Sequence, residues 1–164
     1  MESDIMTALA TLISLSNVTD LHGIVVGALG ISWYLLISRS ITSPAGRWAI
    51  FSAAVILASL ITHLAAKQIG ETDPSLIVLD ELIVIPFVFA FYQLKWARPD
   101  LLFVPFGLLV FGLFDLRKPL GLVYLEALPG GVGIVADDLG AALYAGAIVW
   151  VGMRAYRRCF RAQA

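Results

Sequence analysis

Residues 77–85 read Ile-Val-Leu-Asp-Glu-Leu-Ile-Val-Ile, so the adjacent acids Asp80 and Glu81 interrupt an otherwise apolar segment. The surrounding run, 76–94, approaches the roughly 20 residues that a membrane-crossing helix needs. A charged side chain costs a few kcal/mol near the centre of a bilayer and less near its edge. We therefore expect this acidic pair at a membrane edge, with a partner that compensates its charge.

The whole chain shares this apolar character. Of its 164 residues, 60% are hydrophobic and 14% are charged, and the mean hydropathy is +0.90. Soluble domains carry roughly 25% charged residues, so we predict an integral membrane protein. With 11 basic and 12 acidic residues the chain has no broad basic surface for nucleic acid. A lone cysteine, Cys159, excludes a disulfide framework and a thiolate zinc cage.

Apolar stretches recur along the chain, separated by short charged or Gly/Pro-containing segments. The five stretches are 21–38, 48–66, 76–94, 101–114 and 139–153. They predict an all-α integral membrane bundle of about five membrane-embedded helices, with a short N-terminal helix before them. We expect one domain over 1–164, with 1–19 as an N-terminal segment and 154–164 as a basic tail.

If the chain crosses the membrane five times, its acidic and basic residues are separated between the two membrane faces. One face receives 11 acidic and 3 basic residues, and the other receives 1 acidic and 8 basic residues. The positive-inside bias explains the basic face and puts it in the cytoplasm, and the basic tail is suited to anionic headgroups. The bias does not explain carboxylates inside apolar runs.

Two further acidic motifs lie on the same face as Asp80 and Glu81. In the first, Asp115 and Lys118 are three residues apart and share a helix face, which suits a phosphate held through a metal. In the second, Asp137 and Asp138 follow a glycine-rich turn whose backbone amides are expected to approach an anionic ligand. The glycines of that turn are Gly130, Gly131 and Gly133.

Carboxylates converging from several helices repel one another unless they are protonated or bridged by a divalent cation. Hard oxygen ligands, with one Cys and few His, favour Mg²⁺, Mn²⁺ or Ca²⁺ over zinc. A purely structural alternative is that the acids are solvated helix ends. His63 also lies toward the acidic face. We expect it to be a hydrogen-bonded residue at a helix interface rather than a metal ligand.

In their order and spacing these three blocks resemble phosphatidylglycerophosphatase A. The likeness covers about residues 20–150 and includes His63 followed by Ala66 and Lys67. It implies an all-helical, Mg²⁺-dependent enzyme that removes the terminal phosphate of phosphatidylglycerophosphate to give phosphatidylglycerol. We expect the protein to lie in the lipid bilayer of the bacterial inner (cytoplasmic) membrane. Its expected partner is a membrane phospholipid, the substrate.

The resemblance also implies roles for the motif residues. Four acids are expected to hold the metal: Asp80, Glu81, Asp137 and Asp138. Asp115 would complete the metal shell or act as a base. The expected substrate-binding residues are Lys118, Arg117, Gly130, Gly131, Gly133 and His63.

Some positions depart from the family's pattern, namely Val84, Gly112, Gly121 and residues 20–22. Gly112 stands where an Arg is expected, and Arg117 or Lys118 would then replace its charge. Two alternatives remain open. One is a catalytically silent family member that binds metal or lipid, and the other is a divalent-cation carrier, whose carboxylates should lie nearer the bilayer midplane.

Overall fold

The structure is a computed structural model that describes residues 5, 7–8, 22–70, 77–91 and 98–161. Its helices are α2 (His22–Ser40), α3 (Pro44–Ile69), α4 (Leu79–Val88), α5 (Arg98–Arg117), α6 (Leu122–Glu126) and α7 (Gly131–Arg161). The described part contains no strand, which confirms the all-α prediction. The expected N-terminal helix lies mostly outside these residues, as do Asp20 and Leu21.

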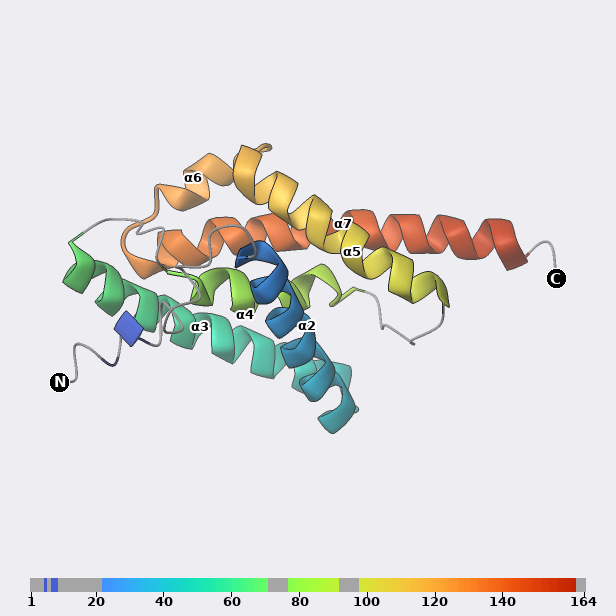
Figure 1. Ribbon diagram of the computed structural model, residues 1–164, viewed down its shortest axis with the longest axis horizontal. Helices are drawn as coiled ribbons and strands as arrows, with labels where there is room; N and C mark the ends of the chain where they lie inside the picture. The colour runs from blue at the N-terminus through green and yellow to red at the C-terminus, as the bar shows by residue number, and fades with distance from the viewer. Residues whose placement is uncertain (1–4, 6, 9–21, 71–76, 92–97, 162–164) are drawn as a thin grey trace.

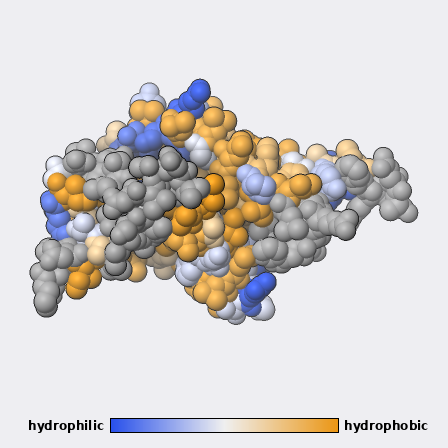
Figure 2. Space-filling view, in the orientation of Figure 1, coloured by the Kyte–Doolittle hydropathy of each residue, from blue (hydrophilic) through white to orange (hydrophobic). Residues whose placement is uncertain are grey.

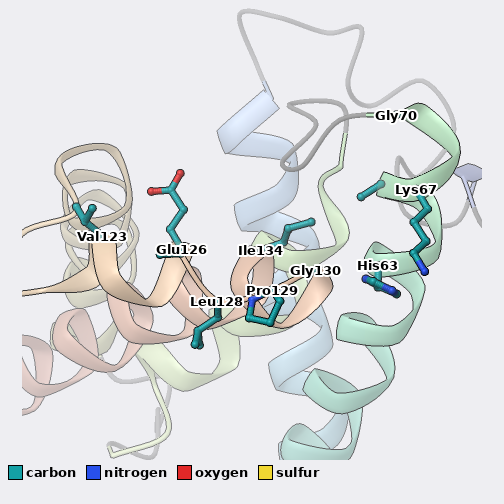
Figure 3. Close-up of a pocket in the computed structure, with 11 residues that line it drawn as sticks. His63, Lys67, Gly70, Val123, Glu126, Leu128, Pro129, Gly130 and Ile134 are labelled. Atoms are coloured by element: carbon teal, nitrogen blue, oxygen red, sulfur yellow. The ribbon is translucent and has the colours of Figure 1, made fainter.

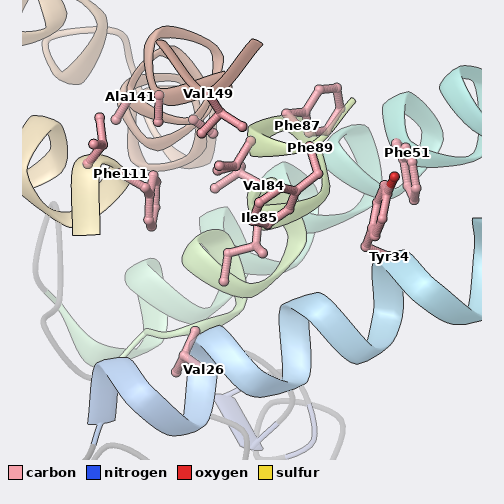
Figure 4. Packing of buried hydrophobic residues seen from close by; sticks show 14 of the residues in the cluster. Val26, Tyr34, Phe51, Val84, Ile85, Phe87, Phe89, Phe111, Ala141 and Val149 are labelled. Carbon is pink, nitrogen blue, oxygen red and sulfur yellow. The ribbon is translucent and has the colours of Figure 1, made fainter. Parts of the chain in front are cut away.

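Helix α4 lies at the centre of the bundle, in contact with α2, α3, α5 and α7 (Figure 1). Its second half is apolar and fully buried, from Val84 to Val88. Figure 4 shows these side chains meeting aromatic residues of α2 and α3, including Tyr34 and Phe51. Burial of this face, at about 25 cal/mol per Å² of apolar surface, holds the helices around α4.

Glycine lets two neighbours approach α4 closely. A Cβ on Gly30 of α2 would stand 2.6 Å from Ile85, and one on Gly146 of α7 would stand 2.8 Å from the Phe87 carbonyl oxygen. Small residues allow this kind of close helix packing in membrane proteins. The crossing of α4 with its neighbours is therefore fixed by backbone shape as well as by side chains.

Within the described residues, three helices are long and apolar enough to cross a membrane, which indicates a membrane protein. They cover Gly23–Ser40, Pro44–Ile69 and Gly131–Cys159. Figure 2 shows apolar side chains over much of the visible surface. Leucines such as Leu60 and Leu109 are exposed. The expected number of five membrane crossings is not confirmed.

Two elements differ from the predicted ranges. Helix α4 has 10 residues and ends two residues after Pro86, because a proline ring removes a backbone donor and obstructs the preceding turn. Helix α7 has 31 residues and begins at Gly131, so Asp137 and Asp138 lie inside the helix rather than before it. The end of α3, the beginning of α7 and α6 gather at one end of the molecule (Figure 1).

Candidate active site

Three carboxylates from two helices form a compact acidic cluster. Ligand-type oxygens of Asp115, Asp137 and Asp138 all lie within 4.8 Å of one another. Asp137 and Asp138 are only 4% and 5% exposed, and Asp115 is half-buried. Like charges held this close in a poorly solvated place repel strongly, so the cluster requires a cation or protons.

Helix ends position these acids and add to their electrostatics. Asp115 lies in the last turn of α5, where the helix dipole disfavours a negative charge. Buried Asp80 lies in the first turn of α4, where the dipole favours one. The charges of Asp80, Asp115 and Asp137 all act on Asp138, and Asp115 also forms a hydrogen bond with it. The structure therefore brings three other predicted acids, Asp80, Asp115 and Asp137, around Asp138.

Lys118 is the cation of this site. Its Nζ lies 2.7 Å from Oδ2 of Asp137 and 3.2 Å from Oε2 of Glu126. Partial burial alone would lower the pKa of the Lys118 ammonium, but its hydrogen bonds and charge interactions with Asp137 and Glu126 outweigh burial and raise that pKa. Lys118 is therefore a permanent positive charge beside the acids.

The backbone that carries Lys118 is unusual. Lys118 and Leu120 have φ values of 41° and 58°, and Gly121 follows with φ 89°. Non-glycine residues seldom adopt this left-handed region, and such conformations persist where the surrounding structure enforces them. Here the Lys118 amide donates to the Phe114 carbonyl at 2.7 Å and closes the end of α5, which turns the side chain back to α7.

A cavity of about 740 Å³ adjoins this ion pair, between α3 and the segment from α6 to the start of α7. Figure 3 shows His63 and Lys67 on the α3 wall and Glu126 on the opposite wall, with Pro129 and Gly130 between them. The Gly131 amide donates to Nδ1 of His63 at 3.3 Å. His63 is thus a hydrogen-bonded interface residue that also lines a cavity.

The glycines before the acidic pair have a packing role in this structure. A Cβ on Gly131 would collide with the Ser59 carbonyl oxygen, and one on Gly133 would collide with that of Leu128. The Gly131 amide is used by His63, and the Gly133 amide donates to the Gly130 carbonyl. Both amides are therefore occupied within the protein, and only Gly130, with φ 66°, occupies the turn itself.

Two other predicted residues, Glu81 and Arg117, are not among the three carboxylates of the cluster. Glu81 lines an apolar cavity of about 750 Å³ between α2, α4 and α5, which Asp115 also borders. Arg117 is exposed at the last residue of α5, outside the Lys118 ion pair.

Sequence reasoning did not assign a role to Glu126 or Lys67. Lys67 is four residues after His63 on a helix, and this spacing puts both on one face, so it offered a usable signal. Glu126 is eight residues from Lys118 across a left-handed turn. No local pattern predicts that contact.

The donor set fits a hard divalent cation. The cluster offers carboxylate oxygens, which suit Mg²⁺ and related ions. Within the described residues Oδ1 of Asp137 is buried and has no hydrogen-bond partner, although buried polar atoms normally have one. A metal ligated by Asp115, Asp137 and Asp138 would use this oxygen.

The chain is similar to known proteins in sequence. A curated protein of Bacteroides thetaiotaomicron named "Putative phosphatidylinositol-3-phosphatase" is 33% identical over 99 residues, which are 57% of this chain and 59% of that protein. The chain thus spans about three-fifths of that relative's length. No solved structure shows a significant match. The family model for phosphatidylglycerophosphatase A matches residues 8–153, and the chain therefore belongs to the phosphatidylglycerophosphatase A family.

Proposed function

We propose that this chain hydrolyses the terminal phosphate of phosphatidylglycerophosphate with Mg²⁺ and releases phosphatidylglycerol, in the bacterial inner membrane. The observation that carries the proposal is the buried cluster of Asp115, Asp137 and Asp138 with the Lys118 ammonium bound to one of its carboxylates. Membership of the family supports the same class of reaction.

Asp115, Asp137 and Asp138 would hold the ion, with Asp80 adding negative charge from α4. A bound Mg²⁺ would stabilise the charge that develops on the phosphoryl oxygens during hydrolysis. Lys118 remains protonated and orients Asp137, and its ammonium is a donor for a phosphate oxygen. Asp115 is the least buried of the three acids, and in this proposal one of its oxygens holds the ion while the other would accept the proton of an attacking water.

The headgroup has two candidates. Phosphatidylglycerophosphate follows from the family, whereas the Bacteroides relative is named for phosphatidylinositol 3-phosphate. Both lipids carry a phosphate monoester on a headgroup that is joined to the lipid by a phosphodiester. We favour phosphatidylglycerophosphate because the family match covers most of this chain, and the relative matches 57% of it.

A divalent-cation carrier would use the same carboxylates. Its sites should lie along a path near the middle of the helices. Here Asp115 is in the last turn of α5 and Asp137 is in the second turn of α7. Placement at helix ends favours an enzyme that meets a headgroup over a carrier.

Purified protein in detergent should release phosphate from phosphatidylglycerophosphate with Mg²⁺, and a chelator should stop the release. Added Mg²⁺ should restore it. Metal binding without phosphate release would show the catalytically silent alternative, and release that is insensitive to chelator would remove the metal from the mechanism.

A further inference from the structure

The cavity of about 740 Å³ is separate from the acidic cluster but adjoins it. Glu126 lines the cavity and also accepts the Lys118 ammonium, whose other contact is Asp137 of the cluster. One lysine side chain therefore separates the two spaces. A ligand held at the acidic cluster would have its neighbouring groups at the mouth of this cavity.

The α3 wall of the cavity has donors for an anion. Nδ1 of His63 accepts the Gly131 amide, so in the neutral imidazole the proton is on Nε2, which is a donor. Lys67 lies one helical turn further along the same face and adds an ammonium group. A neutral donor beside a cation suits a singly charged anion.

The opposite wall is suited to a less charged group. Two apolar side chains line it, Val123 and Leu128, and the charge of Glu126 is already compensated by Lys118. The cavity thus has one anion-binding wall and one mostly apolar wall. A headgroup with two phosphates joined by a short spacer would place one phosphate at the acidic cluster, beside the metal. Its other phosphate would then lie at the α3 wall of the cavity.

We propose that His63 and Lys67 bind the phosphodiester of the lipid headgroup, the phosphate that remains in the product, while the acidic cluster holds the terminal monoester. This inference rests on the proposed function and adds to it a basis for substrate choice. It predicts that the protein prefers lipids with both a diester and a monoester over phosphatidic acid, which has a monoester alone.

The test compares two substrates in Lys67→Gln and His63→Gln proteins. Loss of one charge-assisted hydrogen bond should raise the KM for phosphatidylglycerophosphate about tenfold or more, with kcat little changed. The KM for phosphatidic acid should stay within about twofold, because this lipid does not reach the pair. Arg158→Gln is the matched control, since it removes an exposed basic charge at the far end of α7.

The outcomes separate the two proposals. Equal KM increases for both lipids would overturn the phosphodiester site and leave the phosphatase proposal intact. If neither lipid is hydrolysed by the unmodified protein, the phosphatase proposal fails, and binding of phosphatidylglycerol still tests the cavity. That product retains the diester, so Lys67→Gln should weaken its binding about tenfold, as measured by native mass spectrometry in detergent. Unchanged binding would overturn the site.

Discussion

The two ends of α7 carry opposite charges, and they differ most in burial. Near its beginning Asp137 and Asp138 are buried among other acids. Toward its end Arg154 and Arg158 are exposed. The Cζ atom of Arg154 lies over the Trp150 ring, 5.2 Å from the ring centroid. Separation of charge between the ends follows from membrane topology alone. Burial of like charges does not follow from topology, because it costs stability unless a cation or protons compensate the charges.

This difference in burial is why we propose the acidic end as the functional one. Arg154 and Arg158 are exposed, and an exposed charge is stable by itself. The aspartates repel one another, and Lys118 together with a cation or bound protons would relieve that repulsion. The predictions below test this difference, beginning with the largest effect.

Asp138→Asn should reduce phosphate release at least about 100-fold, because it removes a proposed metal ligand from the most crowded carboxylate position. Without metal the variant should be more stable than the unmodified protein by about 1 kcal/mol, since repulsion with Asp80, Asp115 and Asp137 is relieved. Steady-state assays and thermal unfolding in detergent measure the two effects.

Arg158→Gln is the control from the other end of α7. Its activity should stay within about twofold, as for a typical exposed residue. Similar losses in Asp138→Asn and Arg158→Gln would mean that the acids act through overall surface charge.

The sequence predicted the acidic cluster because charges inside apolar runs must gather where they can be compensated. It could not predict which acid of the Asp80–Glu81 pair lies near the cluster. Successive residues turn by about 100° on a helix, and Glu81 therefore faces the cavity by α2 and α5, while Asp80 is buried near Asp138. That choice depends on how α4 rotates in the bundle.

The sequence also placed Asp137 and Asp138 at the end of a glycine-rich turn. The helix starts earlier because Gly131 lets α7 approach the α3 backbone at Ser59, and this tertiary contact makes a helical start favourable. Glycines alone predict a turn. The cavity beside His63 arises from the same crossing, and for that reason it had no local signal.

Magnesium should stabilise the folded protein through the acidic end. At 100 times its Kd, a ligand that binds only the folded state adds about 2.7 kcal/mol. The unfolding midpoint should therefore rise with Mg²⁺ in the unmodified protein and in Arg158→Gln, and it should not rise in Asp138→Asn. An equal rise in all three at matched ionic strength would show that the ion acts through screening.

Lys118 gives a smaller effect with a defined pH dependence. Its pKa in the folded protein is raised above the ordinary 10.5, so its ion pair contributes fully below that value and is lost only as the pH rises through the higher folded pKa. The difference in unfolding midpoint between the unmodified protein and Lys118→Gln should stay constant from about pH 7 to about pH 9. A difference that shrinks within this range would show that Lys118 loses its proton there.

Labelling of Cys159 tests on which side of the membrane each end of α7 lies. The label itself should leave phosphate release unchanged. It is the only cysteine and is exposed near the C-terminal end of α7, far from the acidic cluster. Orientation follows Lys and Arg rather than the acids, so the basic end should face the cytoplasm. A membrane-impermeant maleimide should then label Cys159 only after intact cells are permeabilised, and Cys159→Ser should show no labelling in either state. Labelling of intact cells would place the arginines outside and the carboxylates toward the cytoplasm, and the charge count would then have failed as a guide to orientation in this chain.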